Sequence, residues 1–463
     1  MSTPHDHHLP PVGETNSTTR DAGRHAASPV PFLQAFWFWL KLGVISFGGP
    51  AGQIAVMHHE LVEKRRWLSE RRFLHGLNYC MMLPGPEAQQ HATYIGWLMH
   101  GRWGGLVAGT LFVLPSLLLL IALSWLYLRF GNVPLVAGLF YGIKPAVTAI
   151  VLHACWRIGK RTLHNGWLIA IAVAAFVALF ALDLPFPLVV LGAALIGWLG
   201  GRVAPDRFRL PPTHDSNKTL GPALLDDDTP LPAHAQFHWS RLLRTIVVCL
   251  ILWAVPLLLL VQVFGWHSPF SQMAWFFTKA ALLTFGGAYA VLPYVYQGAV
   301  EHFRWLSGPQ MIDGLALGET TPGPLIMVVA FVGFVGGAQT AALGAGHEML
   351  AGVFAAVLVT YFTFLPSFLF IFAGAPFIES TKQAIRLTAP LTAITAAVVG
   401  VILNLALFFA YHVFWPRGFG GALDWPSTLI SGLALLALFR LKWNVMWVIG
   451  GAALLGLAVH SLR

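Results

Sequence analysis

The most constraining feature of this chain is an internal duplication. Residues 37–86 recur as residues 275–324 at a constant offset of 238, without a gap. A Leu-Pro-Ser string at 114–116 also returns at 365–367, so the repeat extends over each half of the chain. Strings as specific as these do not arise by chance from an apolar composition, and two copies of one folding unit are predicted. The paired strings are Phe47-Gly48-Gly49 with Phe285-Gly286-Gly287, Arg66-Trp67-Leu68-Ser69 with Arg304-Trp305-Leu306-Ser307, and Pro84-Gly85-Pro86 with Pro322-Gly323-Pro324.

Long uncharged apolar runs set the environment in which these copies fold. The chain is 57% hydrophobic and 10% charged, whereas soluble globular chains carry about 25% charged residues. A helix needs about 20 apolar residues to cross the hydrocarbon core of a bilayer. We therefore predict an all-α, polytopic membrane protein. The runs of that length are Leu106 to Leu128, Thr245 to Phe264, Met349 to Ile378 and Leu387 to Trp415.

The basic residues predict that the two copies face opposite sides of the membrane. Cytoplasmic loops are enriched in Lys and Arg, and the first copy has basic loops at 64–72 and 157–161. The second copy keeps only Arg304 in the loop equivalent to 64–72, but its hairpin tip at 440–442 is basic where the first copy has Asp183. One unpaired span between the copies would invert the second, as in many secondary transporters. The predicted division is a disordered tail at 1–30, a first repeat at 31–201, a cytoplasmic linker at 202–240, a connecting helix at 241–270 and a second repeat at 271–463.

The Gly/Pro strings predict helices that break inside the membrane. Loops at 60–72 and 157–161 share one side only if an even number of crossings separates them, so the stretch 73–98 must leave on the side it entered. Both copies together then contain about nine full spans and four broken or re-entrant segments. A break leaves backbone groups unpaired, at a cost of several kcal/mol each unless protein, water or a ligand satisfies them.

Four matched breaks suggest a site for an anion. Helices that begin after Pro86 and Pro324 would direct free amides and the positive end of a dipole towards the middle of the bilayer. Close helix packing is the alternative role for paired glycines. The polar run after the first Pro-Gly-Pro has no counterpart in the second copy, so the site is expected to be asymmetric. The candidate binding residues are Lys41, Phe47, Gly48, Gly49, Pro84, Gly85, Pro86, Gln89, Gln90, Lys279, Phe285, Gly286, Gly287, Thr320, Thr321, Pro322, Gly323 and Pro324.

Charged residues inside membrane segments are functional by default, because each costs at least about 2.5 to 3.5 kcal/mol at the centre. Lys41 and Lys279 precede each Phe-Gly-Gly by six residues and could offset the charge of a dianion, or else snorkel to the interface. Glu87, Glu319 and Lys144 are candidates for proton coupling or for supporting the binding residues. Helix capping is the alternative for the two glutamates.

Other sequence features argue against a metalloprotein, a redox enzyme and a nucleic-acid-binding protein. The cysteines Cys80, Cys155 and Cys249 are far apart and form neither a disulfide framework nor a metal or redox motif, so we expect no metal, no cofactor and no enzymatic activity. The net charge of +9 follows from basic loops and does not predict nucleic-acid binding. The Arg-Trp-Leu-Ser strings are expected to anchor Trp67 and Trp305 at headgroup depth, with Ser69 and Ser307 capping the next helices.

The ordered strings Phe-Gly-Gly-Pro, Arg-Trp-Leu-Ser and Pro-Gly-Pro-Glu-Ala-Gln-Gln, repeated in weaker form downstream, resemble the chromate transporter family in its long, two-repeat type. The resemblance covers residues 31–460 apart from the linker. It implies export of chromate from the cytoplasm across the cell membrane, driven by a proton gradient or the membrane potential, and hence chromate resistance. The second copy lacks the Glu-x-Gln-Gln string, so no binding role is carried onto 325–328.

Three functions remain open from the residues alone. The first is an oxyanion carrier that works by alternating access between the repeats. The second is a carrier or channel for sulfate or another oxyanion, since no residue separates chromate from sulfate. The third is a membrane oxyanion reductase, which would need a redox motif. The expected partners are the oxyanion and the lipid bilayer, and a homodimer is carried as an expectation.

Overall fold

The computed structural model describes residues 30–47, 49–131, 133–208, 223–226, 229, 232–285, 287–381 and 388–462. The tail predicted at 1–30 lies outside them except for Val30, as do two candidate binding residues, Gly48 and Gly286. The regular elements of the described residues are helices, with one isolated bridge between Leu68 and Leu225.

The elements of the first half are α1 (Phe32–Ile45), α2 (Gly49–His58), the π-helix η1 (His59–Lys64), α3 (Glu70–Met82), α4 (Glu87–Phe130), α5 (Pro134–Thr162), α6 (Gly166–Phe180) and α7 (Phe186–Val203). Short 3₁₀ turns η2 (Pro205–Arg207) and η3 (Ala233–Ala235) precede α8 (Trp239–Phe264). The second half contains α9 (Pro269–Leu283), α10 (Ala288–Tyr296), the π-helix η4 (Gln297–His302), α11 (Gly308–Thr320), η5 (Leu325–Met327), α12 (Val328–Gln339), α13 (Glu348–Thr381), α14 (Thr388–Phe414), α15 (Trp425–Phe439) and α16 (Val445–Ser461).

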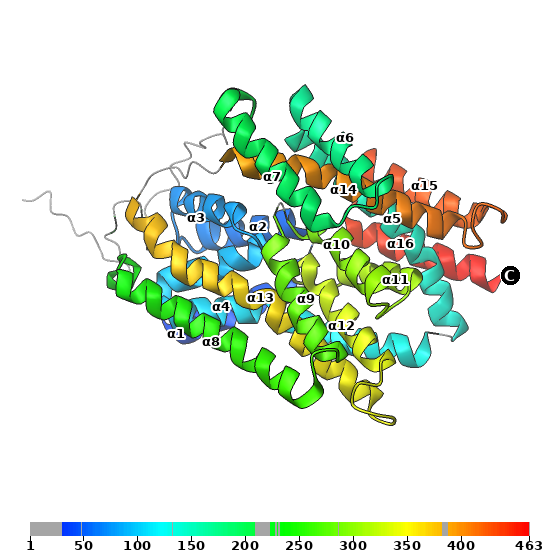
Figure 1. The fold of residues 1–463 in the computed structure, drawn as a ribbon, viewed down its shortest axis with the longest axis horizontal. Helices are drawn as coiled ribbons and strands as arrows, with labels where there is room; N and C mark the ends of the chain where they lie inside the picture. The colour runs from blue at the N-terminus through cyan, green and yellow to red at the C-terminus, as the bar shows by residue number, and fades with distance from the viewer. Residues whose placement is uncertain are drawn as a thin grey trace, which may run out of the picture.

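The two halves correspond element by element. Helices α1, α2, η1 and α3 return as α9, α10, η4 and α11, and α4 returns as the pair α12 and α13. Helix α5 returns as α14, and the hairpin α6–α7 returns as α15–α16. Helix α8 is the single α-helix without a counterpart among the described elements, and it lies along the outside of the molecule beside α13 (Figure 1). The predicted duplication into two repeats is confirmed.

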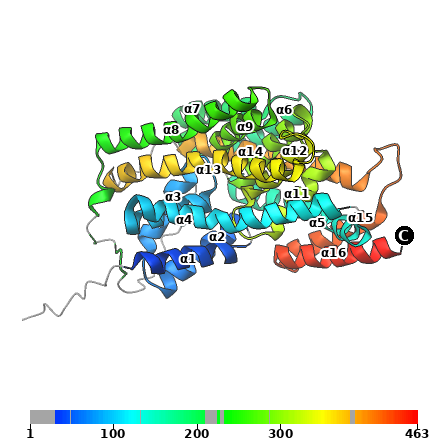
Figure 2. The ribbon, with the colours of Figure 1, turned by 90° about the horizontal axis from the view of Figure 1, so that it is seen from below.

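Contacts between the halves are reciprocal, which shows a pseudo-two-fold relation. Helix α5 of the first repeat packs against α15 and α16, and its counterpart α14 packs against α6 and α7 (Figure 1). Figure 2 shows α1 to α3 at one end of the molecule and α15 and α16 at the other. Together with the unpaired α8, this arrangement is the all-α fold with two inverted-topology repeats expected from the sequence.

Six of the described helices are long and apolar enough to cross a membrane: α4, α5, α7, α8, α13 and α14. Helices α6, α15 and α16 have 15, 15 and 17 residues, which is shorter than the roughly 20 that a full crossing needs. Large apolar side chains of α6, α7 and α8 are exposed, as expected for surfaces that face lipid.

The predicted span at 106–128 is part of the second arm of a helical hairpin, whose first arm begins at Glu87. Helical backbone geometry runs through α4 except at His100 (φ −133°, ψ 21°) and Gly101 (φ 65°, ψ −153°), where the chain reverses direction. The two arms then pack so closely that a Cβ on Gly96 would lie 2.5 Å from the Gly104 carbonyl oxygen. Small residues permit this approach, and α12 and α13 form the equivalent hairpin in the second repeat.

The Arg-Trp-Leu-Ser strings make identical turns in both repeats. Arg66 (φ 55°) and Arg304 (φ 54°) are both left-handed. Ser69 and Ser307 cap α3 and α11, as predicted. The tryptophans differ from the prediction, because Trp67 and Trp305 are buried against the aromatic side chains of α1 and α9. They stabilise the packing between helices and do not anchor the chain at headgroup depth.

Candidate anion site

The four predicted helix breaks are present, and each has the backbone conformation that its glycine makes accessible. Between α3 and α4 the chain is extended at Leu83 and Pro86, with Gly85 at φ +126°. The break between α11 and η5 repeats this geometry, with Gly323 at φ +97°. Residues that carry a side chain rarely adopt such values of φ, so both positions need glycine.

The breaks of one repeat bind the breaks of the other. The Gly85 amide donates to the Thr284 carbonyl at 2.7 Å, and the Gly323 amide donates to the Ser46 carbonyl at 2.8 Å. Ser46 and Thr284 are equivalent residues that directly precede the two Phe-Gly-Gly strings. Each Pro-Gly-Pro therefore meets the Phe-Gly-Gly break of the opposite repeat. These two amides are satisfied by protein, so the amides left for a ligand are those of the first helical turn after each proline.

The Leu-Pro-Ser strings complete this contact between the breaks of the two repeats, which we call the crossing (residues 46, 84–86, 284 and 322–324). A Cβ added to Gly323 would lie 2.7 Å from Ser116 Cβ, and one added to Gly85 would lie 2.7 Å from Ser367 Oγ. Both serines are buried, and each contacts the repeat to which it does not belong. The recurrence of Leu-Pro-Ser was visible in the sequence, but nothing in the string indicated its role.

Buried polar atoms of the first repeat surround the crossing. Among the described residues, five such atoms near it have no hydrogen-bond partner: Ser46 Oγ, Gln53 Oε1, Gln89 Oε1, Gln90 Oε1 and Ser116 Oγ. The ring nitrogens of His91 also lack partners, but this ring packs against Phe73 at the start of α3. A buried polar group without a partner is costly, and in native proteins it requires an explanation such as water or a ligand. Gln53 also donates through Nε2 to the Gly323 carbonyl, which ties α2 to the second break.

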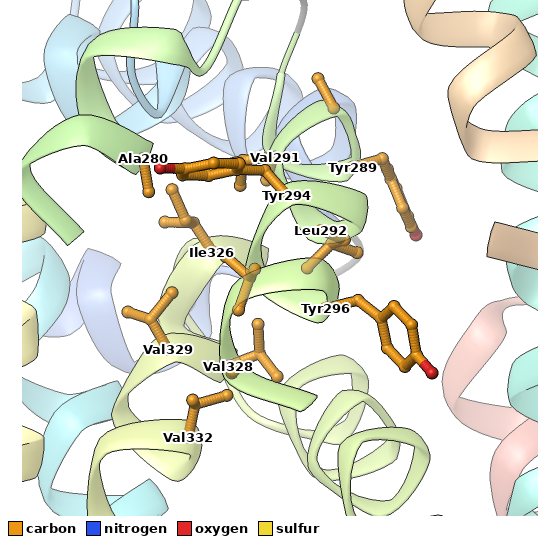
Figure 3. Close-up of a cluster of buried hydrophobic side chains, with 14 of the residues drawn as sticks. Ala280, Tyr289, Val291, Leu292, Tyr294, Tyr296, Ile326, Val328, Val329 and Val332 are labelled. Atoms are coloured by element: carbon orange, nitrogen blue, oxygen red, sulfur yellow. The ribbon is translucent and has the colours of Figure 1, made fainter. Parts of the chain in front are cut away.

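The equivalent surface of the second repeat is apolar. Val291, Val328 and Val329 stand where the first repeat has Gln53, Gln90 and His91, and Figure 3 shows them within a packed hydrophobic cluster. The same view shows the Tyr289 and Tyr296 side chains projecting from one side of that cluster. The predicted asymmetry is therefore a property of the fold: one repeat supplies polar groups and the other supplies packing.

Both candidate carboxylates converge on the start of α10. Glu319 Oε1 accepts a hydrogen bond from the Tyr289 hydroxyl at 2.6 Å. Glu87 Oε1 lies 3.9 Å from the position that a Cβ on Gly287 would occupy. Both glutamates are half-buried. The sequence identified the two glutamates but missed Tyr289.

The lysines lie apart from this crossing. Lys41 is exposed on α1 and has no hydrogen bond or ion pair with another described residue. Lys279 is half-buried on α9, and its Nζ lies 5.8 Å from the centre of the Trp275 ring. Lys144 Nζ is 3.3 Å from Asp313 Oδ2, an acidic partner that the sequence analysis did not single out.

The remaining candidates have local roles around the breaks. Thr320 and Thr321 donate to carbonyls of the last turn of α11. The Pro84 carbonyl accepts from Gln90 Nε2 at 2.7 Å. Phe47 is exposed, whereas Phe285 packs against the main core. The structure thus brings together residues 46, 84–90, 284, 287 and 319–324. The lysines and Phe47 lie apart from this group.

Helices that break at a pseudo-two-fold axis, inside a shell of lipid-length apolar helices, define a multi-pass membrane transporter of the inverted-repeat class. Comparison with known proteins gives the particular family. The sequence model described as "Chromate transporter" matches residues 33–198 and 271–457, two stretches whose starts are separated by the offset of the repeat. The chain belongs to the chromate transporter family, and it is a transporter rather than an enzyme.

Relatives support this assignment over nearly the whole chain. The chain is 34% identical to a "Chromate transport protein" of Pseudomonas aeruginosa, covering 98% of each chain. It is 29% identical to a "Chromate transport protein" of Cupriavidus metallidurans, covering 96% of this chain and 97% of the relative. A shorter protein of Bacillus subtilis, "Uncharacterized transporter YwrA", is 30% identical over 30% of this chain and 80% of its own length. No solved structure matches the chain.

Proposed function

We propose that this protein exports chromate from the cytoplasm across the cytoplasmic membrane, as a secondary transporter working by alternating access. The observation that carries the proposal is the reciprocal pair of hydrogen bonds from Gly85 to Thr284 and from Gly323 to Ser46. Because each repeat completes the break of the other, rocking of one repeat against the other would alter the site from both sides. The substrate comes from the named function of the relatives.

The chemistry of the crossing supports a small oxyanion as cargo. Gln89 and Gln90 are buried in the first turn of α4, so their amide groups lie beside the positive end of a helix. The proposed binding set is the first-turn backbone after Pro86 and Pro324, with the Phe-Gly-Gly segments opposite. Lys41 and Lys279 would add positive charge on the approach. Sulfate presents similar oxygens and charge, so we expect it to compete.

Energy coupling is proposed to involve Glu87 and Glu319. Both carboxylates are half-buried at the start of α10, where a change in their protonation changes the charge next to the anion. The membrane potential alone would also drive a dianion outward. The domain division, the cytoplasmic position of the linker at 202–240 and a homodimeric assembly are parts of the same proposal.

The test is chromate flux in proteoliposomes, with the pH gradient and the potential imposed separately and sulfate as competitor. Gln89→Met installs the residue that the second repeat has at the equivalent position, Met327, and is expected to weaken chromate uptake at least tenfold. Gln34→Met, on an exposed position of α1, is the matched control. Absence of chromate flux through the wild-type protein, with either driving force, would refute the proposal.

A further inference from the structure

A second polar site lies away from the crossing, in a cavity of about 520 Å³. The first three turns of α5 form one wall, and α11 and the end of α16 form others. The lining residues are Tyr127, Leu128, Gly131, Ala137, Phe140, Tyr141, Lys144, Gln310, Asp313 and His460. Cavities of a few hundred Å³ are the usual size of small-molecule sites in proteins.

The charged centre of this cavity is the pair Lys144 and Asp313. Lys144 Nζ lies 3.3 Å from Asp313 Oδ2, which also accepts a hydrogen bond from the Tyr127 hydroxyl at 2.9 Å. The Lys144 side chain is 30% exposed, whereas that of Asp313 is 5% exposed. The ammonium group is therefore available to a solute in the cavity, while the carboxylate stands behind it.

The carboxylate is incompletely satisfied. Asp313 Oδ1 is buried and has no hydrogen-bond partner among the described residues. A buried charge depends strongly on its counter-ion, so Asp313 draws Lys144 towards itself whenever the lysine has no other anion. An oxyanion at Lys144 must compete with this built-in carboxylate.

The other polar groups of the cavity suit the recognition of an oxyanion. Gln310 accepts from the Ser307 amide through Oε1, which leaves its Nε2 as the donating end. Tyr141 donates to Asp424, a carboxylate in the turn before α15. His460 of α16 supplies a further ring nitrogen at the rim. The Tyr127 and Tyr141 hydroxyls donate to Asp313 and Asp424, so the groups that face a solute are the Lys144 ammonium, the Gln310 amide and the His460 ring. One cation with neutral donors suits a small anion, with Asp313 as its competitor for Lys144.

The position of the cavity relates it to the crossing. Asp313 and Glu319 are both on α11, six residues and so about 9 Å apart along the axis. Lys144 and Arg157 are about 20 Å apart along α5, so the cavity lies towards the end of α5 opposite its arginines. In the proposed topology this is the external side.

We propose that Lys144 forms an outward-facing binding site for the transported oxyanion, and that Asp313 displaces the anion from it. The anion that leaves the crossing pairs with Lys144 in the cavity. Asp313 then reclaims Lys144, and the anion is released to the outside. No covalent step is involved. This inference rests on the proposed transport function.

The test uses the purified full chain with sulfate as the probe. A cysteine placed at Ala137, on the cavity wall, is labelled with a charged thiol reagent in the presence and absence of sulfate; the native cysteines are buried. Sulfate is expected to slow labelling in the wild-type background. Lys144→Gln should raise the sulfate concentration needed for protection at least tenfold, and Asp313→Asn should lower it at least tenfold. Arg440→Gln and Asp206→Asn, which remove one exposed charge of each sign, are the controls.

The outcomes separate this inference from the proposed function. If the wild-type protein transports chromate but sulfate gives no protection, or if Lys144→Gln and Asp313→Asn behave as their controls, the outward site is refuted and the transport function stands. If either single variant fails to accumulate, the double variant Lys144→Gln/Asp313→Asn decides, because it leaves no unpaired charge. Loss of protection in the double variant supports the inference, and retained protection overturns it.

Discussion

Substitution of Gly323 by alanine tests whether the crossing of the two repeats is required for transport. At φ +97° an alanine is strained, at a cost of about 1–3 kcal/mol. The added methyl group would lie 2.7 Å from Ser116 Cβ, so the segment must shift, and the bond from its amide to the Ser46 carbonyl is weakened by about 0.5–1.5 kcal/mol. The interlocked arrangement should therefore lose roughly 2–4 kcal/mol.

At 1.4 kcal/mol per factor of ten, that loss lowers the population of the interlocked arrangement by about 30-fold to several hundred-fold. The assay is the initial rate of chromate flux in proteoliposomes, normalised to the amount of protein inserted. Gly450→Ala is the matched control, because no atom lies within 4 Å of a Cβ at that position on α16. The second-site change Ser116→Gly should restore part of the rate, since it relieves the contact but not the backbone strain. A Gly323→Ala protein as active as Gly450→Ala would refute the reasoning.

The remaining predictions concern charge and packing. Glu319→Gln should abolish the stimulation of chromate flux by a pH gradient while leaving potential-driven flux measurable; stimulation equal to wild type would remove Glu319 from the coupling. The substitution of Lys279 or Lys41 by Gln should raise the half-saturating chromate concentration without lowering expression. The larger effect is expected at Lys279, which is half-buried. Unchanged uptake curves for both variants would place the positive charge of the site elsewhere. Trp305→Ala, which removes a side chain that is 2% exposed, should destabilise the protein by about 3–5 kcal/mol, measured as an earlier melting transition in detergent than that of exposed Trp447→Ala.

Much of the architecture was predictable because membrane constraints act on local sequence. The length of the apolar runs predicted the membrane spans. The recurrence of sequence strings at one offset predicted the correspondence between α1–α3 and α9–α11. The breaks at Gly85 and Gly323 were predictable because Gly flanked by Pro cannot continue a helix. A reversal between residues 98 and 106 followed from the side on which 73–98 leaves the membrane, but its exact place at His100 and Gly101 did not, since a single glycine after a histidine has no such signature.

The site was predictable only in part, because its contacts join residues far apart in sequence. Gln89 and Gln90 were found from an uncommon polar run inside an apolar segment. Gln53, Tyr289 and Asp313 were missed, since each is an isolated polar residue whose partner lies in another helix. Trp67 and Trp305 were misplaced because a tryptophan beside a basic residue has the same local pattern at an interface and in a buried turn. Whether Lys41 and Lys279 bind the anion stays a prediction.

The reciprocal hydrogen bonds at Gly85 and Gly323 mean that neither repeat completes the proposed transport path without the other. Half of this polypeptide, produced alone, would contain one proline-flanked loop and one aromatic-glycine bend, and both would lack the hydrogen-bond partners that the other half supplies. Severing the backbone between α7 and α8 would therefore yield two fragments that are each inactive, and that regain a complete path only after meeting head to foot in the same bilayer.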